Sequence, residues 1–287
     1  MDKPDTTKRK ILKIIPAARE DIGALQTRRA LPSKFLEHID PFLFLNHHGP
    51  QTYPPNNSGL PFAPHPHRGF QTVTFILKGD VAHKDSAGHE SVIKAGGVQW
   101  MSAGSGLEHE EVSSAKFKKS GGELEILQLW VNLPSKLKMS KPYYVGLQKE
   151  HIPAIDIVNG NGKVHLLSGQ WETCSGAFKP LIDLFLSSIE LNSETKLNLE
   201  TSSNRNVFFY LVKGQLEVNS QAVKPFHLIH FGQTGELIEV KAKEDSLFLF
   251  GHAPPFNEPI ASYGPFVMNT RAEIVQAIQD YQQGKFQ

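Results

Sequence analysis

The sequence of 287 residues predicts an all-β protein with two similar β domains in tandem and one short helix at the C-terminus. First, its apolar runs are short, rich in Val, Ile, Phe and Thr, and many are bounded by Gly, Asn, Asp or Pro. Second, one strand-and-turn motif occurs twice, about half a chain apart. Third, only the C-terminus shows convincing helix signals.

Five segments carry the strongest strand signals. Their β-branched and aromatic residues favour a pleated, half-buried surface, and the turn residues between them limit their length. Short strands of this kind are typical of a β-sandwich or β-barrel. The segments are TVTFIL (72–77), ELEILQLWVNL (123–133), LIDLFLSSIEL (181–191), NVFFYLV (206–212) and DSLFLFG (245–251).

The internal repeat divides the chain in two. FILKGDV (75–81) is similar to YLVKGQL (210–216), each a strand ending in Lys-Gly, and the two lie 135 residues apart. The Lys-rich, Pro-containing segment 134–150 lies between them and resembles a domain boundary. We therefore expect one domain over residues 1–140 and a second over residues 141–287.

The C-terminal helix has both a start and a stop signal. Thr270 is a good N-cap, Glu273 three residues later completes a capping box, and Gly284 is a plausible stop. One apolar face of the helix should pack against the body of the protein. That face consists of Ile274, Ile278 and Tyr281.

Composition excludes several classes of protein. The formal net charge is +1, which gives no basic footprint for direct nucleic-acid binding. No apolar stretch is long enough to span a membrane, and we expect no membrane association. The single cysteine, Cys174, excludes an intrachain disulfide and a thiolate metal cluster, and fits a reducing compartment. A cytoplasmic protein is the expectation.

Two histidines open the first repeat. In PHPHRGF (64–70), His65 and His67 are two residues apart, and Pro66 favours an extended backbone at a strand start or edge. Residues i and i+2 of a strand point to the same face, so both rings should lie side by side. Such a pair is either a polar rim or half of a metal site.

A second pair favours the metal site. In GSGLEHEEV (104–112), His109 and Glu111 are again two residues apart. Two strands that meet inside a barrel would bring three imidazoles and a carboxylate together, a donor set suited to a divalent first-row metal. Glu108 and Glu110 should face the other way, as surface carboxylates.

The remaining histidines and the second repeat offer no equivalent set. Counting back from the Lys-Gly turn of the second copy places Glu200 and Ser202 where His65 and His67 stand in the first. Seven of the ten other histidines are expected at the surface, in local hydrogen bonds or in structural roles. They are His47, His48, His83, His89, His227, His230 and His252. Arg68 either orients a carboxylate or lies on a solvated rim.

Taken together, these motifs resemble the pirin family of the cupin superfamily. The resemblance covers nearly the whole chain and follows the family's order of motifs. They are DPFLFLNHHGP (40–50), PHPHRGFQTVTFILKGD (64–80), AGGVQWMSAGSGLEHEE (95–111), LQLWVNLP (127–134) and YGPFVMNTRAEI (263–274).

The resemblance implies two tandem cupin domains, jelly-roll β-barrels, with a short C-terminal helix. It implies one divalent metal ion in the first domain, bound by His65, His67, His109 and Glu111. Fe(II) is the expected metal, and Zn, Mn, Ni, Co and Cu are alternatives because histidine-rich sites accept several ions.

The resemblance also implies a function. Some pirins show quercetin 2,3-dioxygenase activity on a flavonol-like, small aromatic substrate, and here Glu111 would be the catalytic residue that accepts a substrate proton. Other pirins are regulators, so the alternative is a metal-containing protein that docks a protein partner without turnover. A sugar isomerase is a third hypothesis, disfavoured because no basic cluster for phosphate lies near the ligands. The physiological substrate and the oligomeric state stay open.

Overall fold

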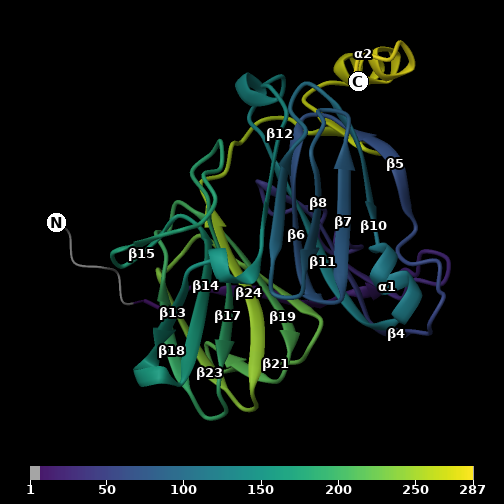
Figure 1. Cartoon of the computed structure of the whole chain (residues 1–287). Helices are drawn as coiled ribbons and strands as arrows, with labels where there is room; N and C mark the ends of the chain where they lie inside the picture. Colours follow the sequence, from purple (N-terminus) through teal and green to yellow (C-terminus); the bar gives the residue numbers. More distant parts are fainter. Residues whose placement is uncertain (1–6, 287) are drawn as a thin grey trace. The chain divides into compact units, whose positions relative to one another are not determined.

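The structure, a computed structural model, describes residues 7–286, and most of its regular structure is β-strand (Figure 1). Contacts divide these residues into two compact units, each with a seven-stranded and a four-stranded antiparallel sheet. We call residues 19–29, 42–151 and 256–286 the first barrel, and residues 7–18, 30–41 and 152–255 the second barrel. The all-β prediction, with two similar domains, is confirmed.

The first barrel contains both histidine–carboxylate motifs. Its larger sheet has the order β12 (Tyr143–Leu147), β9 (Val98–Ser102), β6 (Phe70–Lys78), β11 (Gly122–Asn132), β4 (Phe42–Tyr53), β3 (Thr27–Leu31) and β2 (Ala18–Arg19). The smaller sheet has the order β5 (Phe62–His67), β10 (Leu107–Val112), β7 (Asp80–Asp85) and β8 (Glu90–Lys94). A hairpin of β25 (Ala261–Tyr263) and β26 (Phe266–Met268) precedes the C-terminal helix.

The second barrel repeats this arrangement. Its larger sheet has the order β1 (Ile11–Pro16), β22 (His227–Phe231), β19 (Asn206–Lys213), β24 (Ser246–Ala253), β17 (Phe185–Leu191), β14 (Gly162–Ser168) and β13 (Ala154–Ile157). The smaller sheet has the order β18 (Lys196–Glu200), β23 (Leu237–Ala242), β20 (Leu216–Val218) and β21 (Gln221–Val223). A short hairpin joins β15 (Gln170–Trp171) and β16 (Cys174–Ser175).

The two sheets of each barrel share a buried apolar core. In the second barrel Leu199 and Val240 of the smaller sheet pack in one cluster with Phe209 and Phe250 of the larger sheet. Along β18 such buried residues alternate with exposed ones, as expected for a strand that buries one face. Burial of this apolar surface is the main stabilising contribution to each barrel.

The repeat found in the sequence corresponds to the same turn in both barrels. Gly79 joins β6 to β7, and Gly214 joins β19 to β20. Their φ values are +80° and +84°, a left-handed conformation that glycine adopts without steric cost. The similarity of the two segments therefore reports a shared hairpin at equivalent places in the two barrels.

The C-terminal helix is confirmed. Helix α2 (Arg271–Gln282) begins with the expected capping box between Thr270 and Glu273. Ile274 is buried in a cluster with Phe266 and Phe286, and Ile278 and Tyr281 pack against that cluster. The apolar face thus covers part of the first barrel, to which the helix belongs.

A second helix was not expected. Helix α1 (Ala115–Ser120) has six residues, with Ser114 as N-cap and Phe117 as its one buried side chain. Such a short helix cannot show the repeated apolar spacing that identifies a helix in a sequence. Three 3₁₀ turns, η1 (Ser135–Leu137), η2 (Lys149–His151) and η3 (Val158–Gly160), are shorter still.

Neither compact unit is a single continuous stretch of the chain. The expected boundary assigns residues 1–140 to one domain and 141–287 to the other. In the structure, residues 7–18 group with the second barrel because β1 pairs with β22, and residues 256–286 group with the first. Pairing between segments far apart in sequence leaves no signal in local composition.

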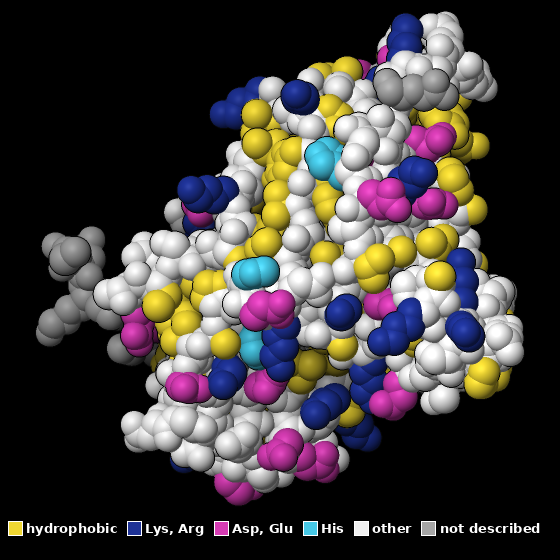
Figure 2. Space-filling model, in the orientation of Figure 1, with side chains coloured by type: hydrophobic (Ala, Val, Ile, Leu, Met, Phe, Trp, Pro, Cys, Tyr) yellow, Lys and Arg dark blue, Asp and Glu magenta, His cyan; other side chains and the backbone are white. Residues whose placement is uncertain are grey.

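Charge is dispersed on the face that Figure 2 shows, where basic and acidic side chains lie interspersed. This agrees with the formal net charge of +1. Among residues 7–286, no helix is both long enough and apolar enough to cross a membrane.

Candidate metal centre

The first histidine pair lies at the end of β5, an edge strand of the smaller sheet in the first barrel. Pro66, which cannot donate to a ladder, is compatible with this edge position. The rings of His65 and His67 lie side by side, with centroids 4.9 Å apart. The extended backbone therefore presents both imidazoles to one region, as the sequence predicts.

His109 joins them from the neighbouring strand. In the register of β10 with β5, His109 is paired with His65, and their ring centroids are 4.5 Å apart. The centroids of His109 and His67 are 4.9 Å apart. One potential ligand atom from each ring lies within 4.8 Å of the other two, a spacing that could hold a metal ion.

Backbone carbonyls orient two of the rings. His65 Nδ1 lies 2.7 Å from the carbonyl oxygen of Ala63, and His67 Nδ1 lies 3.4 Å from that of Pro265. An N–H at Nδ1 that donates to a carbonyl leaves Nε2 as the nitrogen with a free lone pair. Each of these two rings then has a lone pair on Nε2 that can bind a metal ion.

The buried nitrogens test whether this set fits a metal. His67 and His109 are each 2% exposed. Among the described residues, neither His67 Nε2 nor either ring nitrogen of His109 has a hydrogen-bond partner. An unpaired buried polar atom costs about 1–3 kcal/mol, so such a cluster calls for a ligand. The three imidazoles fit a divalent ion.

Electrostatics keeps these rings neutral. Burial, followed by the charge of His65, lowers the pKa of His67 to about 3. Burial, followed by the charges of His67 and His65, lowers the pKa of His109 well below its usual value. Neutral imidazole is the form that binds metal ions, and both rings hold it at neutral pH.

Glu111 lies beside the histidine cluster but is not one of its three members. It is 2% exposed, and its carboxylate accepts hydrogen bonds from Thr74 Oγ1 at 3.1 Å, Gln128 Nε2 at 2.6 Å and Gln99 Nε2. The pairing of β10 with β5 shifts register between His109 and Glu111. Such irregularities re-aim side chains, and here the carboxylate meets two amides. Glu111 as a fourth ligand stays a prediction.

Comparisons with known proteins agree with this geometry. The Pirin family profile matches residues 24–131, and the profile of the pirin C-terminal cupin domain matches residues 186–287. A pirin-like protein of Caulobacter vibrioides is 34% identical over 283 residues, which cover 97% of this chain and 99% of that protein. The chain belongs to the pirin family.

Two further relatives carry the name of an activity. A Pseudomonas aeruginosa protein, named provisionally as a quercetin 2,3-dioxygenase, is 37% identical over 250 residues, 87% of each chain. The crystal structure of quercetin 2,3-dioxygenase from Acinetobacter baumannii matches with a TM-score of 0.91 and 34% identity, over 98% of this chain and 99% of that one. The two barrels of this pirin are therefore cupin domains.

His83 is the neighbour of the centre that the sequence did not identify. The expected surface position is wrong, because His83 is 1% exposed and stacks on Tyr144 with ring centroids 3.8 Å apart. The expected local hydrogen bond is present, from His83 Nε2 to Asp85 at 3.0 Å. The His83 and His109 centroids are 5.4 Å apart. His83 comes to the centre through the register of β7 with β10, where it pairs with Glu111, and no local sequence signal marks that register.

His47 and His48 are also buried rather than exposed. His47 contacts Glu125 at 3.0 Å, and His48 Nδ1 contacts Thr27 Oγ1 at 2.9 Å. Burial lowers the pKa of both rings, that of His48 to about 3. Both the surface position and the local hydrogen bond expected for these histidines are wrong, because their partners lie 78 and 21 residues away in the sequence.

Arg68 does not lie on a solvated rim in this pirin. It is 4% exposed, its Nη1 lies 2.8 Å from Asp280 of α2, and its guanidinium lies over the ring of Phe286. Arg68 orients a carboxylate, which is one of the two expectations. The carboxylate is the side chain of Asp280 and not a group of a substrate. Arg68 therefore anchors the C-terminal helix next to His67.

Proposed function

We propose that this protein is an Fe(II)-dependent dioxygenase that acts on a flavonol-like substrate. The observation that carries the proposal is the set of three converging imidazoles, two of them buried with unpartnered nitrogens, on strands that also carry Glu111. The names of the Pseudomonas and Acinetobacter relatives support the reaction class.

His65, His67 and His109 would hold the ion, with Glu111 as fourth ligand. Three nitrogens and one carboxylate are a suitable set for iron, and they leave positions open for other donors. A bound Fe(II) ion would supply a Lewis acid for a substrate hydroxyl and the electrons for reaction with O₂. Glu111 contributes the one carboxylate of this proposed set.

An aromatic wall beside the histidines offers a surface for a flat substrate. Trp130 stacks on Phe44 with ring centroids 4.5 Å apart and lies 4.4 Å from Phe70. The ring of His67 lies 5.4 Å from Trp130. Because Phe44 and Trp130 are only partly buried, a planar polyphenol can stack on this side of the centre.

A small cavity lined by Glu111 is too small for a substrate. Its volume is about 10 Å³, room for one water at most, and its walls include Glu111, Phe62 and Gln128. A flavonol is much larger than this space. The substrate is therefore assigned to the aromatic wall.

Glu111 is held in place for proton transfer. Gln128 links it to the aromatic wall, because Gln128 donates to Glu111 and accepts from Trp130 Nε1 at 3.0 Å. A carboxylate fixed by Thr74 and the two amides has little freedom to rotate, which favours one geometry for accepting a proton from a substrate hydroxyl. Glu111 is the proposed catalytic residue.

The test is O₂ uptake by protein loaded anaerobically with Fe(II), with quercetin as the flavonol. We expect quercetin-dependent uptake of about one O₂ per flavonol consumed, and none from the His109→Ala variant. A control variant, Glu244→Gln, changes an exposed carboxylate of the second barrel and should keep the activity.

Metal-loaded protein that takes up no O₂ with quercetin would contradict the proposal. The alternative, a metal-containing protein that docks a protein partner without turnover, would then become the leading hypothesis.

A further inference from the structure

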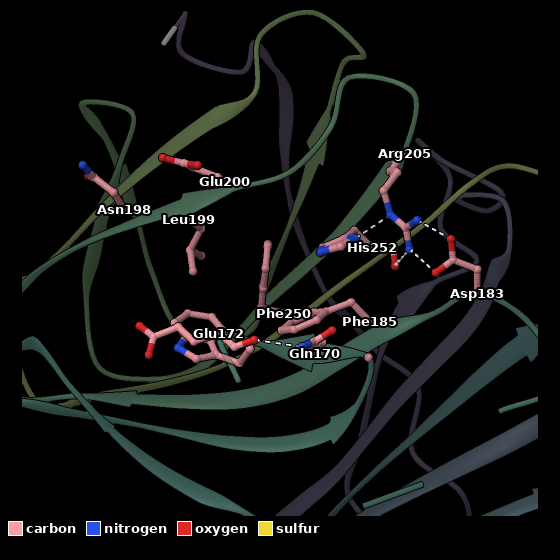
Figure 3. Close-up of a pocket in the computed structure, with 12 residues that line it drawn as sticks. Gln170, Glu172, Asp183, Phe185, Asn198, Leu199, Glu200, Arg205, Phe250 and His252 are labelled. Atoms are coloured by element: carbon pink, nitrogen blue, oxygen red, sulfur yellow. Dashed lines mark hydrogen bonds and ion pairs between the residues drawn. The ribbon is translucent and has the colours of Figure 1, made fainter. Parts of the chain in front are cut away.

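The second barrel contains a pocket of its own, with a volume of about 620 Å³ (Figure 3). Strands β15, β17, β18 and β24 supply most of its walls, and all lining residues belong to the second barrel. The volume lies in the range of small-molecule sites. The proposed dioxygenase chemistry in the first barrel makes no use of this pocket.

The pocket occupies the place in the second barrel that the metal centre occupies in the first. Glu200, on its wall, follows His65 by the 135 residues that separate the two repeats. Phe185 and His252 are paired across β17 and β24, as Phe44 and Trp130 are across β4 and β11. The same part of each barrel therefore carries a group of inward-facing side chains, which are histidines in the first barrel and mostly aromatic and acidic residues in the second.

Aromatic rings form one side of the pocket. Phe185 and His252 are stacked, with ring centroids 4.8 Å apart and an interplanar angle of 3°. Trp171 lies 6.2 Å from Phe185, and Phe250 completes the apolar surface. Stacked rings of this kind favour a flat, apolar molecule over a compact polar one.

His252 adds one directed hydrogen-bond donor. Arg205 Nε donates to His252 Nδ1 at 2.7 Å, so this nitrogen is the acceptor and the neutral ring carries its proton on Nε2. Burial, followed by the charge of Arg205, lowers the pKa of His252 to about 3. Figure 3 shows the second ring nitrogen on the side away from Arg205, facing the pocket.

The free charge of the pocket is negative. Arg205 is engaged by Asp183, with contacts of 2.5 Å and 2.9 Å, and cannot serve an anionic ligand as well. Glu172 and Glu200 remain, both exposed. Figure 3 shows both carboxylates on the side of the pocket opposite the Arg205–Asp183 pair.

We propose that this pocket binds a small organic cation, a protonated amine attached to a flat aromatic body. The aromatic body stacks along Phe185 and His252, and the ammonium group is attracted to Glu172 and Glu200. The Nε2–H of His252 donates to an oxygen substituent on the ring. No metal ion takes part, so the site is independent of the histidine centre.

Three molecules that share one phenol ring test the proposal by calorimetry on the metal-loaded protein. Tyramine carries an ammonium group, tyrosol a neutral hydroxyl, and 4-hydroxyphenylacetate a carboxylate. We expect one tyramine per chain, bound about tenfold more tightly than tyrosol, and no measurable binding of 4-hydroxyphenylacetate.

Variants locate the binding. The double change Glu172→Gln with Glu200→Gln should weaken tyramine binding about five- to tenfold, because two solvent-exposed ion pairs of modest strength are lost together. Glu244→Gln removes an exposed carboxylate outside the pocket and should leave binding unchanged. Quercetin-dependent O₂ uptake should be the same in all of these proteins.

Two results would overturn the proposal. One is binding of 4-hydroxyphenylacetate as tight as that of tyramine. The other is tyramine binding that survives the double change but is lost in His109→Ala, which would place the amine in the first barrel. Neither result bears on O₂ uptake with quercetin, so the two proposals can fail separately.

Discussion

The two barrels of this pirin share a topology but fill equivalent positions differently. In the first barrel, Glu111 pairs with His83 across β10 and β7. In the second, Val240 pairs with Val218 across β23 and β20. A few inward-facing residues therefore separate a candidate metal centre from an apolar core, while the strand order stays the same.

In the second barrel, hydrogen bonds from Arg9 hold the segment around Ser202, which corresponds to the histidine pair of the first barrel. Arg9 is 1% exposed, and its guanidinium donates to the backbone carbonyls of Thr201, Ser202, Ser203 and Arg205. In the first barrel the corresponding segment carries His65 and His67. The comparison teaches that two barrels of the same topology can carry different chemistry at equivalent positions, a histidine cluster in one and backbone contacts to Arg9 in the other.

The sharpest test of this comparison is metal content. We expect about one ion per chain, and nearly complete loss of metal in His109→Ala, because the remaining donors no longer close the site. The matched change in the second barrel, His252→Ala, should keep the full metal content. Two tightly bound ions per chain would break the contrast between the barrels.

Glu111→Gln tests the carboxylate. Replacing it with a neutral amide weakens a donor to a hard ion and sets an amide against Gln99 and Gln128, so metal affinity should fall about 10–100-fold. Metal titration of the apo-protein measures the change. Glu110→Gln, at the adjacent position, should have little effect. If Glu110→Gln strips the metal and Glu111→Gln does not, the assigned site is wrong.

Helix α2, grouped with the first barrel, tests the packing that borders the centre. Ile274 is 7% exposed, and Ile274→Ala should lower the free energy of unfolding by about 2–5 kcal/mol through lost burial and a cavity. Val275 is 53% exposed, and Val275→Ala should change it by less than about 0.5 kcal/mol. Chemical denaturation of both variants measures the difference, and equal effects would mean that the helix face is misassigned.

A pH dependence common to both barrels is also expected. His48 in the first and His252 in the second each have a pKa lowered to about 3 by burial. The unfolded chain, with a histidine pKa of about 6.5, takes up protons that the folded protein does not, so stability should fall as pH decreases from about 6.5 toward 3.

Melting temperatures between pH 7 and pH 4 measure this effect. The variants His48→Gln and His252→Gln should each flatten the pH profile. An unchanged profile in both would show that these rings are protonated in the folded protein.

Much of the fold could be predicted because its signals are local. The Lys-Gly repeat corresponds to one hairpin in each barrel, and the capping box of Thr270 and Glu273 begins a real helix. The two-residue period of strands predicted that His65 and His67 share a face, and the register of β10 with β5 then brings His109 to them. Helix α1 could not be predicted because six residues are too few to show a repeated apolar spacing, and the grouping of residues 7–18 with the second barrel depends on contacts distant in sequence.

By itself, the sequence determined the strand-rich architecture, the asymmetry between the repeats, and the side chains available to bind a metal. These features follow from residue type and from spacing, because residues two apart on a strand point to the same face. Only the tertiary structure decided that Gln99 and Gln128 hold Glu111, that Arg68 meets Asp280, and that Arg205 directs His252 toward a pocket. Each of these depends on strand register and on segments up to 212 residues apart, and local sequence patterns carry no record of such distances.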